Sequence, residues 1–436
     1  MIPELNPSGL IGVGETPQQL QEKAPKKDET DQGEHFSWQN RADLKVYGPY
    51  CPRAGTESDQ AVETGMEDTP VRRLEDNGQA RAPIHLLMEE PQETEAPSAL
   101  DRVMEEARTS SNPVLKSLEP ILRDSRFVKI NHDRIREIAK GLTEKELTPA
   151  NWKFPVFIDE DSDRTIDFFM LGNAINFKFW ENQDPNQKFA TEYNGSNWDG
   201  AFGMWACLKR ALDRGIPVLD ADYLGNLTME QGREIFSGNM EIPMLKERVE
   251  IFRQVGQVLK EKYNGHFSNL VKDAGYKCFD DGNGIVERLA RDFSSYNDVS
   301  RLDETGEDLK FHKRAQLAVG MLYNRLKGTG LFDIKDINEL TVFADYELPK
   351  GLRKLGIMEY TDFLAEKVDS RELILGDSRE EQEIRANTIY AAKLLEDEVN
   401  RLGKHKVNAL NIDFFLWWNG SHSSDSYHHL TETTAY

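Results

Sequence analysis

The sequence predicts a mainly α-helical fold over residues 112–436, formed as a single domain and preceded by an acidic extension over residues 1–111. Three observations support this prediction. Apolar residues recur at helical spacing in several long segments, strand-like alternation is brief, and proline content and charge both change near residue 112. A domain of about 320 residues is large for one hydrophobic core, but within the range that single domains reach.

Four segments of the second part have the apolar spacing of amphipathic helices. The last two also end at a glycine, which is typical of a helix C-terminus. The four segments are residues 129–143, 244–263, 313–328 and 383–403.

Strand-like alternation occurs only around residues 154–159 (FPVFID) and 166–170 (IDFFM). A doubly wound sheet would need a series of strands alternating with the helices. The sequence has no such series, so a parallel α/β fold is not indicated.

The first 110 residues contain 22 Asp and Glu, 11 Lys and Arg, and 10 of the 18 prolines. Such a segment buries too little apolar surface to offset its ordering entropy, so we expect it to be disordered apart from a short helix near residues 99–109. A partner-binding or phosphorylated tail is an alternative. Composition alone favours a solvated extension without such a role.

No apolar run is long enough to span a membrane, and the N-terminal residues lack the pattern of a secretory signal. The three cysteines Cys51, Cys207 and Cys278 are widely scattered, which favours reduced thiols over a disulfide framework. We therefore expect an intracellular protein, cytoplasmic or also nuclear.

The second part of the chain contains 43 basic and 54 acidic residues. This balance disfavours a stable complex with nucleic acid and favours a small substrate.

The common cofactor and metal signatures are absent, among them phosphate-binding glycine loops and HExxH. The acidic run from Asp159 to Asp163 begins like an EF-hand loop, but Arg164 and Met170 replace its required Gly and Glu. We therefore expect no metal and no cofactor.

Two aspartates in aromatic surroundings are the best candidates for chemistry. Asp345 lies between Phe343 and Tyr346, and Asp413 lies in the apolar run 412–418. An isolated charge in such a run is costly, so Asp413 needs a partner, a hydrogen bond or a cavity. Each has a structural alternative: Asp345 as the N-terminal cap of a helix, and Asp413 as half of a buried ion pair.

Other aromatic segments are candidates for stacking a purine-like base, although core packing accounts equally well for most of them. The residues of interest are Asn176, Phe177, Trp198, Phe414 and Trp417.

Taken in order, seven segments of residues 112–436 resemble the queuosine salvage proteins, the queuosine 5′-phosphate N-glycosylase/hydrolases. The segments are FMLGNAINFKFW, WDGAFGMWACLKRALDRGIP, FHKRAQ, FADYELPKGLRKLG, GDSREEQEIRANTIYAAKLL, NALNIDFFLWW and HHLTETTAY. The resemblance implies a helical fold similar to helical DNA glycosylases. It also implies cleavage of the N-glycosidic bond of queuosine 5′-monophosphate, with release of queuine for reinsertion into tRNA.

For that reaction we expect Asp413 to lie beneath the sugar and oppose the positive charge that develops there. Asp345 would then bind the base beside Phe343, although the two aspartates can exchange roles. The candidates for the phosphate are Lys313, Arg314 and Arg385, each with a structural ion pair as the alternative.

Glu383 is a candidate for binding the queuine amine.

Two functions of other classes remain open. One is a binding module for queuosine or modified tRNA that lacks catalysis, which the presence of both aspartates disfavours. The other is an interaction protein that acts through its acidic tail.

Overall fold

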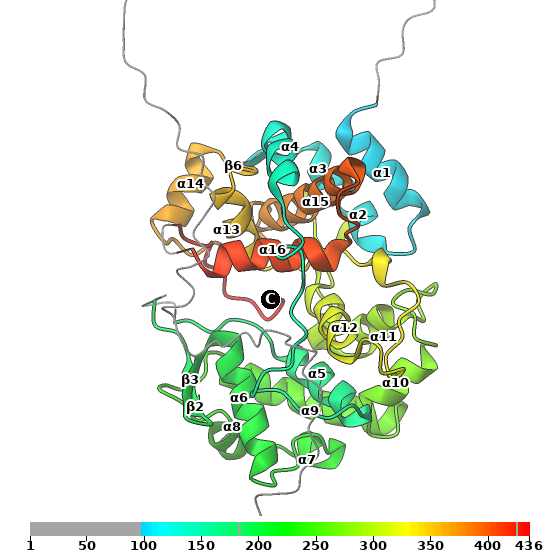
Figure 1. The fold of residues 1–436 in the computed structure, drawn as a ribbon. Helices are drawn as coiled ribbons and strands as arrows, with labels where there is room; N and C mark the ends of the chain where they lie inside the picture. The colour runs from blue at the N-terminus through cyan, green and yellow to red at the C-terminus, as the bar shows by residue number, and fades with distance from the viewer. Residues whose placement is uncertain (1–96, 182–183, 185, 424–425) are drawn as a thin grey trace, which may run out of the picture. The chain divides into compact units, whose positions relative to one another are not determined.

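The computed structural model describes residues 97–181, 184, 186–423 and 426–436. The predicted disorder of the acidic extension therefore falls mainly outside the described residues. The described part is mainly helical, as the sequence predicts (Figure 1).

The described part of the chain contains helices of very different lengths. Their bounds are α1 Ala99–Thr109, α2 Pro113–Ser117, α3 Glu119–Arg123, α4 His132–Gly141, α5 Asp163–Ala174, α6 Gly200–Asp213, α7 Ala221–Gly225, α8 Met229–Ile235, α9 Leu245–Lys262, α10 Phe267–Asp273, α11 Ile285–Asp292, α12 Lys313–Leu326, α13 Glu347–Lys354, α14 Asp362–Asp369, α15 Arg379–Leu402 and α16 Ala409–Ser421.

The strands are short and pair only as two-stranded antiparallel ribbons, β1 with β6, β2 with β3 and β4 with β5. Their bounds are β1 Val128–Ile130, β2 Ala190–Tyr193, β3 Ser196–Asp199, β4 Val299–Arg301, β5 Asp308–Lys310 and β6 Met358–Tyr360.

All four predicted helices are present, as α4, α9, α12 and α15. Their ends follow capping chemistry. The Asn131 side chain accepts from the N–H of Arg134 at the start of α4 (3.0 Å), and α15 ends at Gly403, whose φ of 71° is in the left-handed region that favours glycine.

The two strand-like segments are not strands. Residues 154–159 form turns and irregular chain, and residues 166–170 lie inside α5. Every residue of α5 from Thr165 to Ala174 is buried. A helix that is buried all round has no polar face, so its sequence does not show the helical period.

The helices enclose two hydrophobic clusters. The first is built mainly by α5–α12, and the second by α1–α4 and α13–α16. In Figure 1 the second group of helices lies above the first, and α16 and the C-terminal residues lie where the two groups meet. Contacts of the C-terminal residues agree with this placement. Lys178 of the first group pairs with Glu432 (2.8 Å), and the ring of Tyr346 of the second group lies tilted against that of His428, with ring centres 4.6 Å apart.

Helix α1 lies within the segment that the sequence analysis assigned to the extension. The predicted helix at 99–109 is confirmed, but it is part of the packed structure, because Val103, Met104 and Ala107 are buried. Val103 and Met104 belong to the same hydrophobic cluster as α15, and Lys393 of α15 pairs with Glu106 (3.0 Å). The packed structure thus begins before the expected boundary at residue 112.

Helices α13 and α16 approach each other through two glycines. A Cβ atom added at Gly351 would lie 2.4 Å from the carbonyl oxygen of Leu416, and one at Gly420 would lie 2.1 Å from that of Glu347. Neither backbone can move aside without shifting its helix. This contact therefore fixes α13, and with it Asp345, relative to Asp413 on α16.

Gly351→Ala should lower the free energy of unfolding by about 1–3 kcal/mol, because the added methyl group overpacks this contact. Urea denaturation measures the change. Gly141→Ala is the matched control, since nothing lies within 4 Å of its added Cβ and alanine favours the helix. Equal stability of the two variants would show that the helices are not in such close contact.

Candidate active site

Asp345 is held at the start of α13 by three contacts. Its Oδ1 accepts hydrogen bonds from the N–H groups of Glu347 (2.8 Å) and Leu348 (3.3 Å), and its Oδ2 lies 3.2 Å from Nζ of Lys313. The capping role considered from the sequence is therefore present. It leaves the second carboxylate oxygen in an ion pair with a buried lysine.

Lys313 is positioned by a second acidic residue, Asp298. The Oδ2 of Asp298 accepts the N–H of Lys313 at the first turn of α12 (2.9 Å), next to His312, whose backbone is left-handed (φ 47°). Asp298 in turn forms a two-pronged ion pair with Arg385 of α15, at 2.9 and 2.6 Å. All of these side chains are buried, so Lys313 has little freedom to leave Asp345.

Asp413 lies on α16, and its Oδ2 accepts the N–H of Phe343 (2.7 Å). The pKa of Asp413 is raised to about 8, mainly by burial and also by the charge of Asp345, against the opposing effects of the Phe343 N–H and Lys313. At neutral pH this carboxyl is therefore mainly protonated.

The two aspartates thus differ in charge although each lies close to Lys313. Asp345 is ion-paired with Lys313, and Asp413 is a partly buried acid that is mainly neutral. Pairs of carboxyl groups with such different environments are typical of sites that combine an anion with a proton donor, as in glycoside hydrolysis.

The aromatic candidates near the pair lie in the segment before α13 and on α16. Phe343 is buried against α12, since a Cβ at Gly320 would lie 2.8 Å from its ring. Phe414 and Trp417 are partly exposed on α16, with ring centres 6.0 Å apart. These two rings can contact a bound ligand.

The other aromatic candidates contribute to the first cluster. Phe177 is covered by the guanidinium groups of Arg248 (4.3 Å) and Arg314 (5.1 Å). Asn176 donates to Oδ1 of Asn173 (3.1 Å), and Trp198 in β3 donates to the carbonyl of Tyr193 (3.2 Å). None of their hydrogen bonds or ring contacts in the described part of the chain reaches the two aspartates.

Arg314, expected as a phosphate ligand, has no N–H group left to bind one. Its five donors go to the carbonyl groups of Asn173, Ala174, Ser295, Thr434 and Ala435. The residue instead fastens the C-terminal segment to α5, a role that sequence cannot reveal because its partners are main-chain atoms.

Arg385 and Glu383 are likewise engaged in structural contacts. The ion-pair alternative holds for Arg385, which binds Asp298 and lies over the rings of Phe311 (3.9 Å) and Tyr436 (4.5 Å). Glu383 accepts the N–H groups of Arg126 (2.9 Å) and Phe127 (2.7 Å) and pairs with Arg379. It holds the segment before β1 against α15 and is not placed to bind an amine.

The sequence analysis missed Asp298, Glu347, Lys350 and His428. Glu347 and Lys350 lie two and five residues after Asp345, in the same segment that contains the candidate aspartate. Glu347 is buried, its Oε2 has no hydrogen-bond partner, and burial raises its pKa. Buried polar atoms without hydrogen-bond partners are rare in folded proteins, so this first turn of α13 is a candidate for contact with a ligand.

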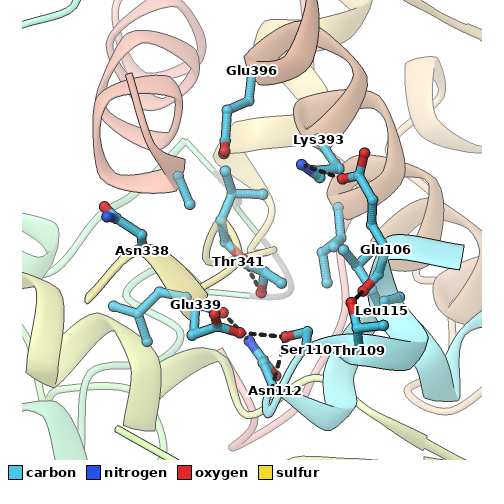
Figure 2. A pocket seen from close by; sticks show the side chains of 15 residues that line it. Glu106, Thr109, Ser110, Asn112, Leu115, Asn338, Glu339, Thr341, Lys393 and Glu396 are labelled. Carbon is cyan, nitrogen blue, oxygen red and sulfur yellow. Dashed lines mark hydrogen bonds and ion pairs between the residues drawn. The ribbon is translucent and has the colours of Figure 1, made fainter. Parts of the chain in front are cut away.

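A cavity of about 240 Å³ lies elsewhere, between the end of α1, the loop 338–342 and α15 (Figure 2). Its polar lining includes Glu106, Glu339, Lys393 and Glu396. Ser110 donates to Glu339 (2.6 Å), and Lys393 pairs with Glu106 (3.0 Å). None of the predicted site residues lines this cavity.

Within the described residues no group of three or more His, Cys, Asp or Glu side chains is arranged to hold a metal ion. Cys207 and Cys278 are buried free thiols, and burial raises the pKa of Cys207 to about 11. No helix in this part of the chain is both long and apolar enough to cross a membrane.

Comparisons with known proteins agree with the resemblance of the seven segments. The model of a family described as queuosine salvage protein matches residues 156–436. A protein from Sphaerobacter thermophilus, named queuosine 5′-phosphate N-glycosylase/hydrolase, is 34% identical over 307 residues, which cover 70% of this chain and 92% of that protein. Proteins of the same name from Mus musculus and Schizosaccharomyces pombe are each 31% identical, covering 68% and 70% of this chain and 89% and 90% of their own.

Proposed function

Because this chain belongs to the queuosine salvage protein family, we propose that it hydrolyses the N-glycosidic bond of queuosine 5′-monophosphate and releases queuine for salvage into tRNA. The observation that supports an enzymatic function best is the pair of aspartates, one ion-paired with Lys313 and one neutral.

We assign Asp345 to the sugar. Breaking the bond between C1′ and the base leaves positive charge on the ribose, and a fixed carboxylate beside C1′ stabilises that charge. Asp345 suits this role better than Asp413, because it is ion-paired with Lys313 and held by two N–H donors, whereas the raised pKa of Asp413 leaves that carboxyl mainly protonated. This is the exchange of roles that the sequence analysis left open.

We assign Asp413 to the leaving base. The base is a 7-deazapurine, so it has no N7 to accept the proton that commonly assists departure of a purine. A neutral carboxyl can donate its proton to another atom of the base as the C1′–N bond breaks. Water then bonds to C1′ and gives up a proton to Asp345, which completes the hydrolysis without a metal or a cofactor. Asp345 then releases this proton to solvent and Asp413 takes one up, which restores the starting state.

The alternatives are a binding module without catalysis and a protein that acts through its N-terminal tail. A binding module gains nothing from keeping a carboxyl buried and neutral beside an ion pair, since both groups cost free energy. Incubating the purified chain with queuosine 5′-monophosphate, and following free queuine by mass spectrometry, separates the enzyme from both alternatives.

The same assay tests the size of the substrate. The acidic balance of the folded part favours a free mononucleotide over intact tRNA. We expect queuine from the monophosphate and much slower release from full-length tRNA. Equal rates would contradict this expectation, and absence of queuine from both would contradict the proposed enzyme.

A further inference from the structure

Three basic side chains come together near His428, and we call Lys188, Lys350 and Arg371 the basic cluster. Arg371 lies over the ring of Tyr427, the residue before His428 (4.6 Å), and Lys188 forms a β-bridge with Trp180, whose ring centre is 5.8 Å from that of His428. Lys350 follows Tyr346 by four residues, and the ring centre of Tyr346 is 4.6 Å from that of His428. Burial and these basic charges together lower the pKa of His428 to about 3. The three residues come from different parts of the chain: the segment before β2, helix α13, and the turn after α14.

Lys350 is the most buried member, with 9% of its side chain exposed. Its nearest carboxylate oxygen, Oε2 of Glu347, is 3.8 Å away and accepts no hydrogen bond. Burial lowers the pKa of Lys350, and the charges of Lys188, Lys354 and Arg371 lower it further, against the opposing effect of Glu347. A buried ammonium group among like charges lacks compensation that a bound anion would supply.

Arg371 has a similar shortage of partners. Its guanidinium lies over the ring of Tyr427 (4.6 Å), and among the described residues no carboxylate is within 4.0 Å of it. Asp184 acts on it only at longer range. Stacking leaves the N–H edge of a guanidinium open, and that edge can bind a phosphate with two hydrogen bonds.

The basic cluster adjoins the two aspartates. Asp345 directly precedes α13 and Lys350 lies five residues further on, about 7.5 Å at the helical rise. Glu347 contacts both residues, since its N–H donates to Oδ1 of Asp345 (2.8 Å) and its Oε2 lies 3.8 Å from Nζ of Lys350. A ligand that reaches both Asp345 and the cluster needs only the length of a sugar phosphate.

We propose that Lys350 and Arg371, assisted by Lys188, bind the 5′-phosphate of the substrate. This inference rests on the proposed function, because the phosphate is the one anionic group of a nucleoside monophosphate. Lys350 and Arg371 thus take the place of Arg314 and Arg385, which the sequence analysis expected to bind the phosphate but whose contacts are structural. The folded part is acidic as a whole. The excess of three basic groups over one carboxyl group therefore distinguishes this cluster from the rest of the folded part and favours the binding of an anion there.

Lys350→Gln and Arg371→Gln should each lower the ratio of kcat/KM for queuosine 5′-monophosphate to kcat/KM for queuosine by at least about tenfold, mainly through KM. Inorganic phosphate should inhibit the unaltered protein competitively and inhibit both variants more weakly. Lys246→Gln is the matched control, because Lys246 also lies 3.8 Å from a glutamate, Glu250, but is exposed on α9.

If the ratio stays within twofold of the unaltered protein in both variants, the inference is wrong. Calorimetric titration with inorganic phosphate separates this inference from the proposed function. Phosphate binding that is weakened in Lys350→Gln and Arg371→Gln supports the cluster even if no queuine is ever released. Binding that is absent from the unaltered protein, or equal in all variants, overturns it, whatever the activity.

Discussion

Asp345→Asn is expected to lower kcat by roughly 100-fold to 1000-fold, the usual effect of removing one electrostatic contact to a transition state. The asparagine keeps the shape of the side chain and can still accept the N–H groups of Glu347 and Leu348, so α13 should remain capped. What it loses is the negative charge beside Lys313 and the sugar. The expected change is therefore in kcat, with a smaller change in KM.

Single-turnover kinetics with queuosine 5′-monophosphate measure this effect, and a melting curve checks that the variant is folded. Asp220→Asn is the matched control, since Asp220 caps α7 by accepting the N–H of Tyr223 (2.8 Å) away from the two aspartates. Turnover above a tenth of the original in Asp345→Asn would exclude Asp345 as the anion beneath the sugar.

The second large effect concerns pH. If Asp413 donates a proton, kcat/KM should fall about tenfold per pH unit above its pKa of about 8, because the free protein then loses the acid. Asp413→Asn should be at least about 100-fold slower and should lose this alkaline limb. A limb that persists in Asp413→Asn belongs to another group and would contradict the assignment.

The same substitution should change stability in a pH-dependent way. The pKa of Asp413 is raised from its ordinary value to about 8 in the folded protein, so the unfolded chain releases this proton first. The stabilising effect of the protonated carboxyl is complete below pH 4 and is lost as the pH rises toward 8. Asp413→Asn should therefore match the original protein near pH 4 and exceed its free energy of unfolding by at least about 1 kcal/mol at pH 8.

Chemical denaturation at the two pH values measures that difference. Asp163→Asn, at the exposed start of α5, is the control that should show no comparable change. A stability difference that is the same at both pH values would indicate that Asp413 is ionised in the folded protein.

Features of the fold could be predicted from the sequence where they depend on residues close together in the chain, and not where they depend on residues far apart in it. Helix α15 was predicted because its apolar spacing and Gly403 are local features. Helix α5 was partly misread as a strand, because full burial removes the polar positions that show the helical period. Asp413 was recognised because its apolar neighbours in sequence are also its neighbours in space.

Long-range contacts to the main chain left no trace in the sequence. Arg314 looks like any basic residue at the start of a helix, and only the fold brings five carbonyl groups to it. Asp298 reaches the N–H of Lys313 across the β4–β5 ribbon, so its role in positioning that lysine depends on the closing of the ribbon. The aspartates proposed for the chemistry were therefore easier to identify from the sequence than residues such as Asp298, which position them through contacts that only the fold creates.

Hydrolysis itself is tested most directly by a single turnover of queuosine 5′-monophosphate in water enriched in ¹⁸O, with both products identified by mass spectrometry. We expect unlabelled queuine and ribose 5-phosphate in equal amounts, the sugar with one ¹⁸O when it is analysed before exchange, and neither product in the same time from Asp345→Asn. Release of queuine with no solvent oxygen in the sugar phosphate, or no release by the unaltered protein, would contradict a hydrolase built on these two aspartates.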